Sequence, residues 1–170
     1  MKIPYALMAG LLGSLILALP TVATEKTVVG WIEKVRIYPG NFLVHAKLDS
    51  GAEYSSLDAN NLQVFERDGK KWVRFDLAEK REGTKITIER PLLRLATIKR
   101  HYLQSQQRPV IKIGVCLGNI YKETEVNLVD RKGFQYRMLI GRKFTEGAVI
   151  IDPSAQYTVE PHCQESATLE

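Results

Sequence analysis

The chain contains 170 residues, of which 24 are Lys or Arg and 19 are Asp or Glu, so its formal net charge is +5. Apolar residues make up 45% of the chain and charged residues 25%, which excludes a disordered or collagen-like protein. The length fits a single domain. Two cysteines are too few for a disulfide-rich scaffold or for a zinc site built from four cysteines.

The first segment has the pattern of a secretory signal peptide. Lys2 precedes an uncharged apolar run, and Thr21-Val22-Ala23 places compact residues at the −3 and −1 positions of a cleavage site. We therefore predict a signal peptide over 1–23, a mature domain over 24–157, a tail over 158–170 and a periplasmic location. The alternative is an uncleaved N-terminal anchor with the domain facing the periplasm. No later apolar run is long enough to span a membrane, so we expect no integral membrane body.

After this segment, short β-rich runs separated by turn signals predict an all-β protein. Two runs alternate between apolar and polar residues, as half-buried strands do, and Gly118-Asn119 is a hairpin turn signal. The series is typical of a barrel or sandwich, here of about six to eight short strands. The predicted strands are 28–32, 42–48, 71–77, 84–89, 110–117, 120–129, 138–140 and 148–151. At most two short helices are expected, one over 58–64 and a single turn after Gly141.

Export affects the interpretation of the cysteines and the charges. In an oxidising compartment Cys116 and Cys163 can form a disulfide, but their spacing leaves this pairing open because it does not give the distance between the Cα atoms. The basic residues occur as isolated pairs interspersed with acidic residues, which is typical of a solvated surface. We therefore expect no nucleic-acid partner.

The motif that most suggests chemistry is Asp49-Ser50-Gly51-Ala52, directly after the predicted strand 42–48. That strand would carry the Asp49 carboxylate into a tight turn, where Gly51 allows a backbone shape that a side chain would hinder. A carboxylate held rigidly in this way suits catalysis. The same residue types also favour an ordinary turn without a function, so the motif alone leaves both interpretations open.

A second element, Met138-Leu139-Ile140-Gly141-Arg142, supports the catalytic interpretation. An Asp-Ser-Gly-Ala turn after one strand and a Gly-Arg pair after a later apolar strand resemble the layout of retropepsin-like aspartic proteases. The run 47–57, with Arg108-Pro109-Val110-Ile111, Asp130-Arg131 and Ile151-Asp152-Pro153, is similar to one bacterial branch, the RimK-associated retropepsin-like endopeptidases. The resemblance covers about residues 28–157 and implies a retropepsin-like acid-protease barrel.

That branch is often labelled an ATP-dependent zinc protease, and the residues do not support the label. The sequence has no His-Glu-x-x-His motif for zinc and no Gly-x-x-x-x-Gly-Lys-[Ser/Thr] loop for ATP. His45, His101 and His162 have no second histidine at ligand spacing. We expect no metal and no cofactor.

The resemblance implies an aspartic mechanism in which two carboxylates share one proton and activate a water. The chain has one Asp-Ser-Gly motif, so a homodimer with one Asp49 from each subunit is implied. The resemblance also predicts a Glu53–Arg142 ion pair beside Gly141 that supports the turn Asp49-Ser50-Gly51-Ala52. A flap over the substrate is implied as well, and its candidate is the segment 79–84, which contains Gly83.

Three functions remain open on the sequence. The first is an exported aspartic endopeptidase that acts on a peptide or protein substrate. The second is a catalytically inactive domain that binds peptides in the same cleft, and the third is an envelope-interaction domain on the same fold. Glutamate-rich peptides are a candidate substrate, because the branch is associated with RimK-type ligases that add glutamate to proteins.

Overall fold

The computed structural model describes residues 25–78, 83–100 and 103–163, which form eleven β-strands and one short helix. The predicted all-β fold class is therefore confirmed, while the predicted signal peptide over 1–23 lies outside the described residues. Within those residues no helix has the length and apolar character needed to cross a membrane. The elements in chain order are β1 (Thr27–Tyr38), β2 (Phe42–Leu48), β3 (Ser55–Asp58), β4 (Asn60–Arg67), β5 (Lys70–Ala78), β6 (Lys85–Pro91), β7 (Arg94–Arg100), β8 (Leu103–Leu117), β9 (Ile120–Val129), β10 (Met138–Ile140), α1 (Arg142–Thr145) and β11 (Val149–Gln156).

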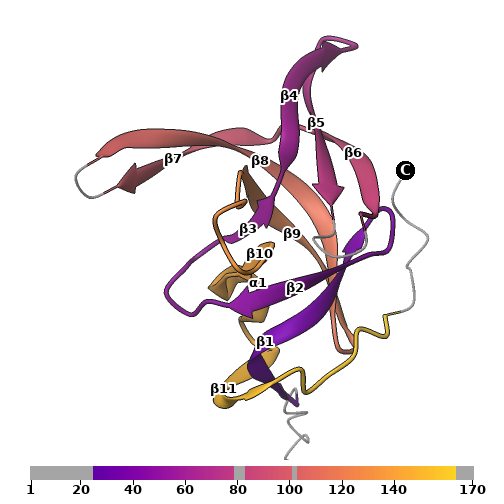
Figure 1. Ribbon diagram of the computed structural model, residues 1–170, viewed down its shortest axis with the longest axis vertical. Helices are drawn as coiled ribbons and strands as arrows, with labels where there is room; N and C mark the ends of the chain where they lie inside the picture. The colour runs from indigo at the N-terminus through magenta and orange to yellow at the C-terminus, as the bar shows by residue number, and fades with distance from the viewer. Residues whose placement is uncertain (1–24, 79–82, 101–102, 164–170) are drawn as a thin grey trace, which may run out of the picture.

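The larger sheet curves into a barrel that encloses the hydrophobic core. Its strand order is β11-β1-β2-β10-β3-β9-β8-β7. An additional pairing between β1 and β8 joins the two ends of the series β1-β2-β10-β3-β9-β8, so these six strands form a closed ring (Figure 1). Side chains from each wall fill the interior, because alternate residues of a strand point to the same face. Ile37, Leu57, Val115, Leu128 and Met138 are all fully or almost fully buried there.

A smaller sheet of β4, β5 and β6 projects from the barrel at the top of Figure 1. Its inner face joins the same core through Val73, Phe75, Leu77 and Ile88, which are at most 2% exposed. The small sheet is therefore part of one hydrophobic unit with the barrel, and this agrees with the single domain predicted from the length.

The eight predicted strands all fall on observed strands, but the predicted helix over 58–64 is wrong. Asp58 ends β3 and Asn60 begins β4. Every residue of β3 is buried, because this strand lies between β9 and β10 inside the barrel wall. Strands β3, β4 and β7 were not predicted, whereas the single helical turn after Gly141 is confirmed as α1.

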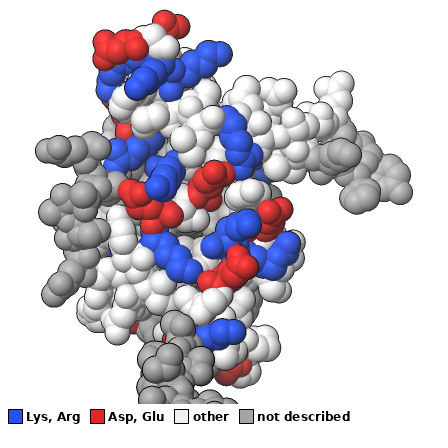
Figure 2. Space-filling view, turned by 180° about the vertical axis from the view of Figure 1, so that it is seen from behind, with Lys and Arg blue, Asp and Glu red and all other residues white. Residues whose placement is uncertain are grey.

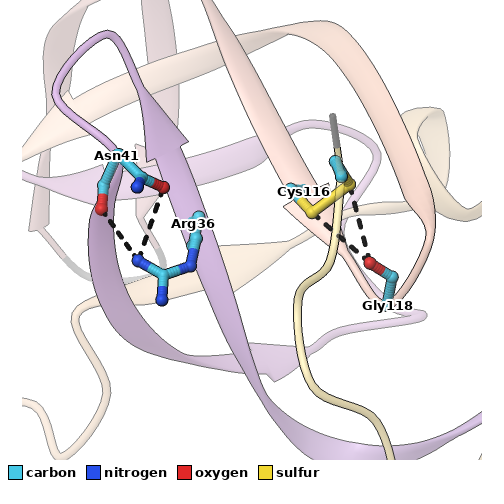
Figure 3. Close-up of a disulfide and its surroundings, with 5 residues drawn as sticks. Arg36, Asn41, Cys116 and Gly118 are labelled. Atoms are coloured by element: carbon cyan, nitrogen blue, oxygen red, sulfur yellow. Dashed lines mark hydrogen bonds between the residues drawn. A yellow bond between two sulfur atoms is a disulfide. The ribbon is translucent and has the colours of Figure 1, made fainter. Parts of the chain in front are cut away.

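The chain after β11 packs on the barrel instead of leaving it as a tail. The backbone N–H of Tyr157 donates to Ile32 O at 2.8 Å, and that of His162 donates to Gly118 O at 2.8 Å. Cys163 forms a disulfide with Cys116 of β8, which answers the question that the sequence left open (Figure 3). Residues 158–163 therefore belong to the folded domain, and residues 164–170 lie outside the described part of the chain.

Candidate active site

Asp49 stands where β2 leaves the barrel wall and enters a tight turn. Its backbone N–H donates to Ile140 O of β10 at 2.8 Å, and its own carbonyl accepts a hydrogen bond from Ala52 N at 3.2 Å. The carboxylate oxygen Oδ1 accepts a hydrogen bond from Gly51 N at 3.0 Å. The Asp49 side chain is thus fixed by its own turn while it remains partly exposed to solvent.

The register of the neighbouring strands explains why the Gly-Arg element meets this turn. β2 and β10 run parallel, with Leu48 paired to Ile140, so both strands end at the same level of the barrel. Gly141 then packs directly on the backbone of the turn, where a Cβ atom would lie 2.6 Å from Tyr54 C. Gly141 N also donates to Ser55 Oγ at 3.1 Å. Only a glycine allows this approach of the two segments.

Arg142 holds the turn through hydrogen bonds and not through the predicted ion pair with Glu53. Its Nη1 atom donates to Ser50 O at 2.8 Å, and its backbone N–H donates to Ala52 O at 2.9 Å. Within the described ranges, no ion pair joins Glu53 to Arg142, so that prediction is wrong. The guanidinium instead uses a backbone carbonyl of the turn as its acceptor. Glu53 still contributes, because its carbonyl accepts a hydrogen bond from Lys143 N at 3.0 Å.

A buried polar network lies next to the turn and was not predicted from the sequence. Arg131 is 5% exposed; its Nη1 donates to Ser56 Oγ at 3.2 Å, and its Nε donates to Tyr136 O at 3.0 Å. Asp58 accepts hydrogen bonds from Arg131 N at 2.7 Å and from the Arg137 guanidinium. Burial lowers the pKa of Arg131, while the nearby carboxylates of Asp58 and Asp49 act to raise it. The Asp130-Arg131 pair was the only sequence signal for this network.

A cavity of about 330 Å³ opens beside the turn, between it and the β7–β8 hairpin. Arg94 of β7 lies over the Tyr54 ring at 5.0 Å and pairs with Glu125 at 2.6 Å. Arg108 of β8 donates to Asn127 Oδ1 at 3.1 Å. Sequence reasoning missed both the hairpin and the cavity, because residues 94–100 carry no strong strand pattern. The lining residues are Ala52, Glu53, Tyr54, Ser56, Arg94, Ala96, Ile98, Arg108, Val110, Asn127 and Leu139.

A second hollow, of about 420 Å³, is lined by Arg142 of the Gly-Arg element. It is lined by the acidic residues Glu53 and Glu146 and by the basic residues Arg142 and Lys143, with Val149 at the start of β11. The two hollows therefore share Glu53 in their lining, and both carry basic side chains.

Most of the predicted flap, residues 79–84, lies outside the part of the chain that the structure describes. Residues 79–82 lie outside the described residues, and Gly83 is an exposed residue just before β6. The strands on either side do form a hairpin, since Ala78 pairs with Lys85. Ile86 lies against Gly40, where a Cβ atom would come within 2.8 Å of its Cδ1. Gly40 precedes β2 whereas Asp49 follows it, so Ile86 lies at the end of β2 opposite to Asp49.

The donors around the turn do not fit a zinc ion. His45 is bonded through Nδ1 to the Tyr157 hydroxyl at 2.9 Å, and His162 belongs to the segment near the disulfide. Across the described ranges, no three His, Cys, Asp or Glu side chains gather in a group that could hold a metal. His101 lies outside the described residues. No step proposed below uses a metal ion.

Acidic and basic side chains are interspersed over the face of the molecule seen in Figure 2. The described residues form ion pairs such as Lys112–Glu123 at 2.7 Å and Arg94–Glu125 at 2.6 Å. Mixed charges of this kind agree with the solvated surface predicted from the isolated basic pairs.

Comparisons with known proteins agree with the geometry of the turn. A family model described as "RimB-like: Retropepsin-like aspartic endopeptidase RimB" matches residues 28–162. Two curated relatives, each named "Probable alpha-L-glutamate ligase", come from Desulfotalea psychrophila and Shewanella pealeana and are both 34% identical to this chain. The matches cover 72% and 67% of this chain but 27% and 25% of the relatives, so the chain spans about a quarter of their length.

A solved structure shares the fold over most of the chain. It is the crystal structure of Lpg0085, a protein with unknown function from Legionella pneumophila, and it matches with a TM-score of 0.69 and 29% sequence identity. The match covers 80% of this chain and 100% of the solved one.

Proposed function

The chain belongs to the RimB-like family of retropepsin-like aspartic endopeptidases, and from this premise we propose that it hydrolyses peptide bonds as a homodimer. The observation that carries the proposal is the Asp49 turn. Its carboxylate is fixed by Gly51 N, its backbone by Ile140 O, and its Ser50 carbonyl by the Arg142 guanidinium. A catalytic group must be held this firmly to act on a substrate bond.

In the proposed mechanism, two Asp49 carboxylates meet across a two-fold axis. Two carboxylates at close range share one proton, because both cannot be ionised together. The ionised partner takes a proton from a water held between them, and the protonated partner donates a hydrogen bond to the scissile carbonyl. One chain supplies one such turn, so the second copy completes the site.

We propose peptides rich in glutamate as the substrate class. The support is indirect: relatives that contain a similar segment are named "Probable alpha-L-glutamate ligase". Together the two hollows beside the turn carry four basic side chains, Arg94, Arg108, Arg142 and Lys143, against the two acidic ones of Glu53 and Glu146, and this basic excess would favour an acidic peptide. The location proposed for this activity is the periplasm, on the basis of the N-terminal signal pattern.

The test is cleavage of a mixed peptide library by the mature protein, residues 24–170, from about pH 4 to 7, with Asp49→Asn as the inactive variant. Asparagine keeps the size of aspartate but cannot ionise, so cleavage should disappear while folding is retained. Asp68→Asn is the matched control, because Asp68 is an exposed hairpin residue on the projecting sheet. It should cut like the wild type.

Two results would contradict the proposal. Equal cleavage by wild type and Asp49→Asn would point to another nucleophile. No cleavage by a wild-type dimer that is shown to be folded would instead favour a domain that binds peptides without cutting them. A titration with the same peptides would then detect the binding.

A further inference from the structure

One ribbon of chain, residues 141–163, joins the candidate active site to the disulfide. It begins with Gly141 and Arg142, which hold the Asp49 turn, and it continues as β11 along β1. It ends at Cys163, bonded to Cys116 of β8. We call its last part, residues 157–163, the strap. In Figure 1 the yellow ribbon runs from β11 along the lower edge of the barrel.

The strap is held by a buried carboxylate. Glu33 of β1 is 0% exposed, and its Oε1 accepts hydrogen bonds from Thr158 N at 2.9 Å and Thr158 Oγ1 at 2.6 Å. Its other donors are Gly30 N at 2.7 Å and Val159 N at 3.4 Å. Most of the groups that satisfy this carboxylate therefore come from the strap. A buried carboxylate that loses its donors is strongly disfavoured, so Glu33 and the strap depend on each other.

The far end of the strap is anchored at the β8–β9 turn. The Gly118 carbonyl accepts hydrogen bonds from His162 N at 2.8 Å, and it faces the sulfurs of both cysteines (Figure 3). The disulfide links residues 47 positions apart. A covalent link over this separation restricts the unfolded and partly opened chain strongly.

The strap also packs through Val159, which lies against the hydrophobic core, and makes further contacts on the surface. Lys34 pairs with Glu160 at 2.5 Å, where the two side chains are 33% and 54% exposed, and Tyr157 bonds to the exposed His45. Exposed pairs of this kind contribute little to stability. Without the disulfide, the strap would be held by Glu33, by one backbone bond at each end, by Val159 and the buried Pro161, and by these weak surface contacts.

We propose that the Cys116–Cys163 disulfide is a redox latch on the candidate active site, an inference whose catalytic meaning rests on the proposed function. A dithiol reductant attacks Cys163 Sγ and releases the Cys116 thiolate; its second thiol then displaces Cys163. Two electrons pass to the protein, which gains two thiols, and the reductant becomes a cyclic disulfide. Reduction removes the covalent anchor of the strap, so the strap opens more often from Glu33, β11 is held less firmly on β1, and Arg142 is held less firmly on Ser50 O.

Hydrogen exchange of the mature protein tests this directly. The variant Cys163→Ser opens the latch without disturbing Cys116, which is fully buried and whose replacement would endanger folding. We expect amide exchange at least ~tenfold faster in the strap, in β11 and in residues 49–53 than in the oxidised wild type. Wild type treated with dithiothreitol, after mass spectrometry confirms reduction, should behave in the same way. Dithiothreitol added to Cys163→Ser is the control and should change nothing.

Faster exchange confined to the strap, or no change at all, would overturn the inference. Exchange is measured without substrate, so this failure is distinct from failure of the proposed peptidase activity, which Asp49→Asn tests.

Discussion

Gly141 shows how closely the residues of the candidate active site are packed. A Cβ atom at this position would lie 2.6 Å from Tyr54 C and 2.8 Å from Glu53 O, both backbone atoms of the adjoining segment. Backbone atoms cannot rotate away as the end of a side chain can. The glycine of the Gly-Arg element is thus required because there is no room for a side chain between position 141 and this backbone.

Replacing Gly141 by alanine should therefore displace the turn that carries Asp49. We expect a loss of about 1–3 kcal/mol in the free energy of unfolding, measured by urea denaturation, together with loss of cleavage. Gly133→Ala is the control, because a Cβ atom there meets nothing within 4 Å. Equal stability of the two variants would show that the packing at Gly141 is looser than described.

Asp76 on β5 predicts a specific dependence of stability on pH. Hydrogen bonds from Asn61, Thr87 and Lys85 lower its pKa from 3.8 to about 2. Because the pKa of the folded state lies below that of the unfolded state, the contribution to stability is present above pH ~4 and is lost as the pH falls toward 2. The shift corresponds to at most about 2 kcal/mol.

Urea denaturation of wild type and Asp76→Asn at about pH 5 and pH 2 measures this contribution. The wild type should be the more stable protein at the higher pH, and the difference should shrink on acidification. A difference that stays constant between the two pH values would contradict the assignment to Asp76.

Among the elements near the site, most strands of the barrel wall were predictable, whereas β3 within the wall and β7 beside the cavity were not. Strands such as β2 and β10 are apolar runs bounded by turn signals, which sequence patterns detect well. β3 reads Ser-Ser-Leu-Asp, and its polar residues are buried because Ser55 bonds to Gly141 N, Ser56 to Arg131 and Asp58 to Arg137. No local pattern shows partners so distant in sequence, so β3 was not predicted.

The cavity beside the turn was missed for a related reason. It is formed where the β7–β8 hairpin lies against the turn, and strand β7 has exposed apolar residues such as Leu95, which is 52% exposed. Such a strand lacks the alternation of buried apolar and exposed polar residues by which a half-buried strand is predicted. The Glu53–Arg142 pair failed for another reason: a long arginine side chain had a backbone carbonyl, Ser50 O, within reach.

The hydrogen bond from Arg142 of α1 to Ser50 O should matter more for activity than for stability. Arg142→Leu removes the bond to Ser50 O and keeps the backbone bond to Ala52 O. We expect cleavage to fall about tenfold or more, because a catalytic group loses its fixed position, while the free energy of unfolding changes by about 1 kcal/mol or less. Lys71→Leu on the projecting sheet serves as the control for loss of an exposed cation, and it should leave cleavage unchanged. Parallel losses of activity and stability would indicate a purely structural role for Arg142.

At the scale of the whole molecule, the barrel presents one Asp49 turn, and the proposed mechanism needs two. The family could be predicted from two short motifs, the Asp-Ser-Gly-Ala turn and the Gly-Arg pair, which directly follow β2 and β10. The all-β fold could be predicted from the series of short β-rich runs. The arrangement of two copies does not follow from a pattern within one chain, because it depends on complementarity between surfaces. The dimer is thus the part of the proposed function most open to direct test.

Mixing wild type with Asp49→Asn at constant total protein concentration tests whether two Asp49 residues form one site. If each active unit needs an Asp49 from both subunits, mixed dimers are inactive and cleavage follows the square of the wild-type fraction. After subunit exchange, an equal mixture should retain about one quarter of the wild-type activity. Retention of about one half, with a linear dependence on the wild-type fraction, would show that each subunit acts alone and would contradict the shared dyad.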